Sequence, residues 1–273
     1  MINLLVAEST RLWARRMTRF FPLGLAALFV AGIVIAFLVI SNDDGNSPDF
    51  VDDMAGGVGA QDVLGPITAV LPLMAFVIGG SYIGADAKTG MLEQLLTWEP
   101  RRLRFLVARL VSLVVGVAVL AMALAVFLVA LLYSLAASTG TVDGVTGELW
   151  GNIAVIVLRT GLAAGLFSAF GFGVTLLINN SVGAIVGFVI YWFIIENFLV
   201  AVFLPRVSSY LPITNADSFA SGRDVERLEG NVFQGEVDTI VSHGYLTAGV
   251  VLAAWVALAV IAAALVFVRR DID

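Results

Sequence analysis

Long runs of uncharged, mostly apolar residues constrain this chain more than any other feature. Residues 20–40 and 110–142 contain no Asp, Glu, Lys or Arg. A helix rises about 1.5 Å per residue, so about 20 such residues cross a hydrocarbon core of about 30 Å. The chain of 273 residues is 60% hydrophobic and only 13% charged, whereas soluble domains are about 25% charged. The sequence therefore excludes a soluble globular protein and predicts an all-α integral membrane protein.

Six apolar runs predict six transmembrane helices in a single domain that covers residues 1–273. The stretch 150–205 holds only two charges and is too long for one crossing, so we expect a tight turn at 179–181 to divide it. The six expected spans are residues 20–40, 63–83, 106–135, 153–178, 182–204 and 245–268.

The basic residues predict the side of the membrane that each loop faces. Most of the 15 Lys and Arg residues lie before the first expected span, between the second and third, or after the sixth. Because basic loops are retained in the cytoplasm, we expect both termini and the 84–105 loop to be cytoplasmic. The 205–244 loop is then extracytoplasmic. The first span is longer than the apolar core of a signal peptide, so we interpret it as an anchor that is retained.

Residues 1–19 have the periodicity of an amphipathic helix. Its expected apolar face includes Val6 and Trp13, and its polar face carries Glu8, Arg11 and Arg15. We expect an elbow helix that lies in the cytoplasmic interface with its arginines directed at lipid phosphates. It serves either as an orientation anchor alone or also as a contact for a cytoplasmic partner.

The residue inventory excludes several functions. The chain has no Cys and a single His, His243, so thiol catalysis is absent and a histidine-built metal site is disfavoured. Its net charge of −6 argues against a nucleic-acid partner. Ala87 stands where a phosphate-binding loop needs glycine before its lysine, and no HExxH motif is present. We therefore expect no cofactor or metal in this chain and no enzymatic activity of its own.

Two charges fall inside expected spans. Arg159 lies about six residues into the fourth span and Glu196 about eight residues from the outer end of the fifth, which places both roughly 10 Å below the outer surface. An unpaired charge at this depth is costly, so we expect an intramembrane pair between Arg159 and Glu196. The pair is interpreted either as a clamp on the helix hairpin or as a site for substrate or protons.

The 84–105 loop contains a short, strongly apolar segment. Residues 91–98 predict a helix of about two turns, which Pro100 ends because proline cannot continue a helix interior. Such an apolar helix beneath the membrane indicates either a docking site for a partner or an interfacial helix that fills space between two spans.

This organisation resembles the permease subunits of ABC-2 type transporters. The resemblance rests on six spans, an N-terminal elbow helix, a basic loop after the second span, and a motif within that loop. The motif reads Asp86, Ala87, Lys88, Thr89, Gly90, Met91, Leu92, Glu93, Gln94, Leu95, Leu96, followed by Pro100, Arg101 and Arg102. The chain departs from the family pattern at Asp86, where glutamate is more usual, and at Trp98 and Glu99, which precede the proline.

The resemblance implies a function and its partners. The loop helix is then a coupling helix on which a separate ABC ATPase docks, through Asp86, Gly90, Met91, Leu92, Glu93, Leu95, Leu96, Arg101 and Arg102. Two ATPase copies and a second permease, identical or homologous, complete the unit in the plasma membrane, with ATP and Mg²⁺ bound by the ATPase. The cargo implied is a lipid-like or amphipathic solute that is exported.

Two other functions remain open from the sequence. One is a secondary, ion-coupled transporter that uses Glu196 as its proton site. The other is a non-transporting membrane anchor or assembly protein, for which the loop helix recruits a partner.

Overall fold

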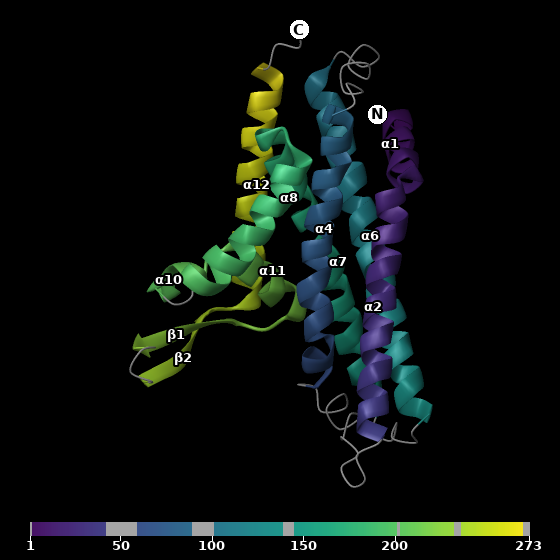
Figure 1. Cartoon of the computed structure of the whole chain (residues 1–273), viewed down its shortest axis with the longest axis vertical. Helices are drawn as coiled ribbons and strands as arrows, with labels where there is room; N and C mark the ends of the chain where they lie inside the picture. The colour runs from purple at the N-terminus through teal and green to yellow at the C-terminus, as the bar shows by residue number, and fades with distance from the viewer. Residues whose placement is uncertain are drawn as a thin grey trace.

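The computed structural model describes residues 2–41, 59–88, 101–138, 145–200, 203–231 and 236–269. Its long helices are α1 (Ile2–Ala14), α2 (Arg16–Ser41), α4 (Gly59–Lys88), α6 (Arg102–Ser138), α7 (Gly147–Ile178) and α12 (Tyr245–Arg269). The shorter elements are α8 (Ser181–Ile190), the π-helix η1 (Tyr191–Val200), α10 (Pro205–Ser208), α11 (Pro212–Ser221), β1 (Val225–Asn231) and β2 (Glu236–His243). The long helices run side by side in a bundle, and the two strands project from its flank (Figure 1).

Four of the described helices are long and apolar enough to cross a membrane. These candidate spans are Thr68–Asp86 in α4, Arg102–Ser134 in α6, Gly147–Ile178 and Tyr245–Arg269. The described part of the chain is thus that of an α-helical membrane protein. The first and fifth expected spans correspond to shorter apolar helices, Thr18–Ala31 and Ser181–Glu196. The count of six spans therefore stays a prediction.

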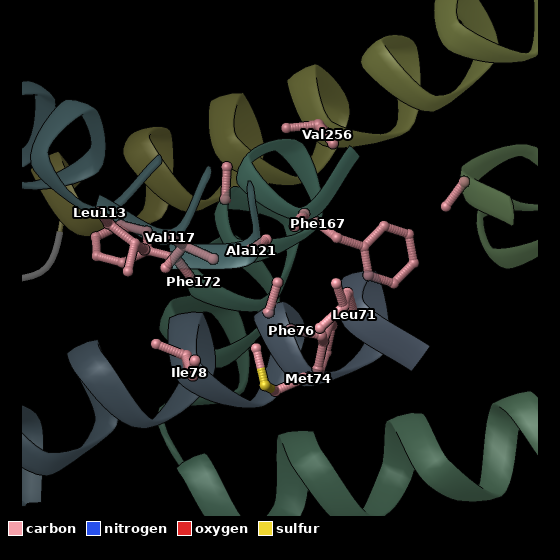
Figure 2. Packing of buried hydrophobic residues seen from close by; sticks show 14 of the residues in the cluster. Leu71, Met74, Phe76, Ile78, Leu113, Val117, Ala121, Phe167, Phe172 and Val256 are labelled. Atoms are coloured by element: carbon pink, nitrogen blue, oxygen red, sulfur yellow. The ribbon is translucent and has the colours of Figure 1, made fainter. Parts of the chain in front are cut away.

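Helix α7 is the centre of the bundle and packs against α4, α6 and α12. The buried residues Phe167 and Phe172 of α7 lie among Phe76 of α4 and Val117 of α6, as Figure 2 shows. The ring of Phe76 also stacks on Phe188 of α8, with centroids 3.7 Å apart. These contacts join helices that are far apart in the sequence into one apolar core.

Helices α4 and α7 approach closely because glycines face backbone at their contact. A Cβ atom on Gly79 of α4 would collide with the carbonyl oxygen of Ser168, and one on Gly171 of α7 would collide with that of Phe76. Small residues allow helix backbones to pack this tightly in membranes, where van der Waals contact contributes much of the association.

Helix α7 ends where the sequence predicts a turn. Asn179 adopts a left-handed conformation with φ of 56°, which asparagine tolerates better than most residues. The side chain of Asn180 then accepts hydrogen bonds from the amides of Val182 and Gly183, each 3.1 Å long, and so caps α8. From this turn, α8 leads away from the bundle towards α10 (Figure 1).

The 205–244 segment differs from the expected loop, since it folds into α10, α11 and a β-hairpin. Strands β1 and β2 pair antiparallel, with Glu226 opposite Val241 and Arg227 opposite Ile240. The β2 sequence interleaves β-branched residues with polar ones, a composition that favours strands. Helix α11 packs on α7 and α12 and so joins this module to the bundle.

Candidate functional site

Four charged side chains converge at the end of the bundle where α1 begins and α12 ends. Glu8 comes from α1, Arg15 from the junction between α1 and α2, Asp86 from α4 and Arg109 from α6. Arg109 has no exposed surface, and only 3% of Glu8 and 5% of Asp86 are exposed. We refer to these four residues together with Tyr82 as the charge cluster.

Asp86 is the bridging member of the charge cluster. Its Oδ1 lies 2.5 Å from Nη2 of Arg15, and its Oδ2 forms an ion pair with Nη2 of Arg109. One carboxylate thus connects the α1–α2 junction with α6. Burial lowers the pKa of the Arg15 guanidinium from its usual value, although the charge of Asp86 opposes this effect.

Tyr82 lies one helical turn before Asp86 and faces the same side of α4. Its hydroxyl donates a hydrogen bond of 2.6 Å to Oε2 of Glu8. Its ring centroid lies 4.5 Å from Cζ of Arg15 and 4.5 Å from Cζ of Arg109. Tyr82 therefore connects the acid of α1 with both cations, through a hydrogen bond and two cation–π contacts.

Arg109 takes its polar contacts from other helices, and the ring of Phe105 on its own helix adds a cation–π contact with the centroid 5.6 Å from Cζ. Its Nη2 donates to the carbonyl oxygen of Tyr82 at 3.1 Å, and its Nε lies 3.9 Å from Oε2 of Glu8. Nε and Nη1 have no hydrogen-bond partner among the described residues. A buried cation with so few compensating contacts makes each of its carboxylate partners energetically important.

The expected docking residues fall into two groups. Gly90, Met91, Leu92, Glu93, Leu95 and Leu96 lie outside the described residues. Arg101 is exposed, and Nη1 of Arg102 donates to the carbonyl oxygen of Val268 in α12 at 3.3 Å. The carboxylate of Asp86 belongs to the charge cluster. Docking on this loop stays a prediction.

The N-terminal helix packs through parts of both of its expected faces, since the apolar Leu12 and the polar Glu8 are both buried. Glu8 is buried and Arg15 is mostly buried, whereas Val6 and Trp13 are exposed. The reason is that Glu8 and Arg15 find oppositely charged partners on α4 and α6, which compensate for their burial. Asp86 is the one member of the charge cluster that was predicted as a site residue. The other members, Glu8, Arg15, Tyr82 and Arg109, were missed, and the available signal was the charge of Arg109 at the start of a long apolar run.

The structure does not form the expected ion pair between Arg159 and Glu196. Oε1 of Glu196 accepts hydrogen bonds from the amide and the hydroxyl of Thr214, at 2.7 and 3.0 Å. Cζ of Arg159 instead lies 4.3 Å from the ring centroid of Tyr245. Glu196 finds its partners in α11 because the N-terminus of that helix has no side-chain cap of its own, and free amides there attract a carboxylate.

A second polar contact joins α11 to the β-hairpin. Nε2 of His243 lies 2.9 Å from Oδ1 of Asn215, and its ring stacks on that of Tyr210 with centroids 5.2 Å apart. Burial lowers the pKa of His243, although the charge of Asp224 opposes this effect. The neutral imidazole therefore donates its Nε2 proton to the Asn215 amide oxygen.

No family model matches this chain, and none of the curated protein sequences matches it. Within the described residues, no group of three or more His, Asp or Glu side chains is placed to hold a metal ion.

Proposed function

We propose that this chain is the membrane-spanning permease subunit of an ABC-2 type transporter, and that it exports a lipid-like or amphipathic solute. Two copies of a separate ATPase dock on the 86–100 loops and hydrolyse ATP with Mg²⁺. A second permease, identical or homologous, completes the unit. The complex lies in the plasma membrane with both termini of the permease in the cytoplasm.

The observation that carries the proposal is the charge cluster at the base of the docking loop. Asp86 lies near the end of α4 and Arg109 near the start of α6, so their ion pair joins the two helices that flank this loop. Arg15 adds the α1–α2 junction through the same carboxylate. A force applied to the loop is therefore shared by several helices, which is what a coupling loop needs at its base.

The resemblance to ABC-2 permeases implies the following transport cycle. ATP closes the two ATPases, which pull residues 91–96 of each permease. The helices joined by the charge cluster move together, and the path between the two permeases opens to the outside. Hydrolysis of ATP returns the unit to its resting state.

Purification with partners tests the proposal. The tagged chain is isolated from native membranes in mild detergent, and the eluate is analysed by mass spectrometry and by an ATPase assay. We expect a stoichiometric ATPase that contains a phosphate-binding loop. A chain that purifies alone and still moves solute in proteoliposomes would contradict the proposal.

A loop variant tests where the ATPase docks. Leu92→Glu combined with Leu95→Glu places two charges on the expected coupling helix, and we expect loss of the ATPase from the eluate while the chain still inserts. Val241→Glu is the matched control, because Val241 is exposed on β2, away from the loop. Full ATPase recovery and solute-stimulated activity in the loop variant would show that docking occurs elsewhere.

An ion-coupled transporter is the second candidate, and one observation favours it. Only 3% of Glu196 is exposed, and its Oε2 has no hydrogen-bond partner among the described residues. A carboxyl group in this setting can take up and release a proton. This candidate predicts transport without any ATPase and loss of that transport in Glu196→Gln.

A further inference from the structure

One cation within a candidate span has no part in the coupling mechanism. Arg159 lies within the candidate span Gly147–Ile178, nine residues after Trp150, so about 13 Å of helix separates the two. Trp150 packs against Tyr133 of α6 with ring centroids 5.4 Å apart. Such aromatic side chains are typical of the membrane–water interface. The backbone of Arg159 therefore lies inside that end of the α7 span, while its guanidinium reaches Tyr245, the first residue of the candidate span Tyr245–Arg269.

The surface around Arg159 is apolar. Val155, Leu158 and Leu162 lie on the same face of α7, and each is about half exposed. Arg159 itself is partly exposed within this stripe. Its guanidinium is thus available to a molecule that lies along the apolar face of α7.

Arg159 has an aromatic partner but no anionic one in the described part of the chain. Its Cζ lies 4.3 Å from the ring centroid of Tyr245, the first residue of α12. No described carboxylate lies within 4.0 Å of its nitrogens. A guanidinium keeps its proton in proteins, and a cation in an apolar span is costly unless an anion accompanies it.

The chemistry of the guanidinium determines which anion fits. The contact of Cζ with the Tyr245 ring is a cation–π contact, and it leaves the N–H groups of Arg159 to donate hydrogen bonds to an anion. The planar fork of the guanidinium matches the paired oxygens of a phosphate or a carboxylate.

We propose that Arg159, in cation–π contact with Tyr245, binds the phosphate or carboxylate headgroup of an amphiphile whose apolar part lies along Val155, Leu158 and Leu162. The site thereby assigns the proposed export function a class of solute, an anionic amphiphile, and it rests on that proposed function only in calling this amphiphile the cargo.

Lipid binding by the purified full chain tests the proposal. Radiolabelled dioleoyl phosphatidic acid is titrated against the chain in neutral maltoside micelles, with dioleoyl phosphatidylcholine as the zwitterionic comparison. We expect saturable binding of the phosphatidic acid, weakened at least tenfold by Arg159→Gln. Arg159→Lys keeps the charge but loses the planar fork, so we expect an intermediate affinity.

Two further variants separate the site from general effects of charge and folding. Tyr245→Leu removes the aromatic ring and should weaken binding several-fold, while Tyr245→Phe should leave it unchanged. Arg206→Gln, at an exposed arginine of α10, is the matched control for loss of one positive charge and should bind as the wild type does. Should Arg159→Gln fail to fold, Arg159→Lys and Tyr245→Leu still measure the site.

Three results would overturn the proposal. They are equal binding of both lipids, unchanged binding in a folded Arg159→Gln chain, and displacement of the lipid by inorganic phosphate at equal concentration, which would indicate a site for free oxyanions. The assay uses the permease alone, so it is independent of the ATPase. A chain that binds phosphatidic acid through Arg159 but never associates with an ATPase would contradict the proposed function and leave the binding site in place.

Discussion

The guanidinium of Arg109 has no exposed surface, and carboxylates from α1 and α4 compensate for the burial of its charge. The two carboxylates of the charge cluster do not contribute equally. Asp86 forms close ion pairs with Arg15 and Arg109, whereas Glu8 approaches Nε of Arg109 only to 3.9 Å and is bonded chiefly to Tyr82. Removal of Asp86 therefore leaves two cations close together, while removal of Glu8 leaves Asp86 in place.

The first prediction follows from this inequality. Asp86→Asn should lower the free energy of unfolding by about 3 kcal/mol, because a buried cation loses its closest anion. Glu8→Gln should lower the free energy of unfolding by a smaller amount. Reversible unfolding in detergent measures both, with Glu226→Gln, at an exposed residue of β1, as a control that should stay within about 0.5 kcal/mol of the wild type. If the Asp86→Asn protein were as stable as this control, the charge cluster would not hold these helices together.

The second prediction concerns pH and His243. Its Nδ1 is buried without a hydrogen-bond partner among the described residues, so a proton added there finds no acceptor. The pKa of His243 is lower in the folded chain than in the unfolded chain, where it is about 6.5. The unfolded state therefore binds more protons below that pH, and stability should fall as the pH drops from about 6.5 towards the folded pKa. We expect the melting temperature to decline over this range in the wild type, and to decline less in His243→Gln.

At the scale of elements, the contact between α4 and α7 depends on glycine. The third prediction is that Gly171→Ala lowers the free energy of unfolding by about 1–3 kcal/mol, because its methyl group meets the backbone of Phe76 and the helices must separate. Gly187→Ala is the matched control, since Gly187 of α8 has open space around its Cα. Alanine there should be neutral or stabilise by up to about 1 kcal/mol, because it is the better helix former. Equal effects of the two substitutions would contradict the close approach.

The helices could be predicted from the sequence because their signal is local. The uncharged run that starts at Leu110 and the turn at Asn179 each depend on neighbouring residues only. The charge cluster depends on contacts between residues far apart in the sequence, such as Arg15 and Asp86. No periodic pattern in the sequence indicates such a contact. The hydrogen bonds between Glu196 and Thr214 were also missed. Thr214 lies in a segment too polar to be predicted as a span, so it was not considered as a partner. The hairpin escaped prediction because β1 has three charged residues and a single β-branched one, although the composition of β2 favours a strand.

At the scale of the whole molecule, the charge cluster and the β-hairpin lie at two different levels along the bundle. Arg102 of α6 meets Val268 of α12 at the same end as the charge cluster. The β-hairpin lies further along the bundle, beside the start of α12, where Asp224 accepts a hydrogen bond of 3.2 Å from the amide of Tyr245. If basic segments are cytoplasmic, Arg101 and the hairpin face opposite sides of the membrane.

The fourth prediction uses the absence of cysteine from the sequence, which lets a single introduced thiol report its own position. Arg101→Cys places a thiol at an exposed site near the charge cluster, and Val241→Cys places one at an exposed site on the β-hairpin. A membrane-impermeant maleimide should label Val241→Cys in right-side-out vesicles and Arg101→Cys in inside-out vesicles, and detergent should make both fully reactive. Position 101 precedes α6, and position 241 lies on β2, which precedes α12. If the two thiols are labelled from opposite sides, the chain between them must cross the membrane an odd number of times. That number is three if α6, α7 and the α8–η1 segment all cross, as six spans require. Labelling of both thiols from the same side would mean that α8 and η1 do not complete a crossing, and the six-span topology would then be wrong.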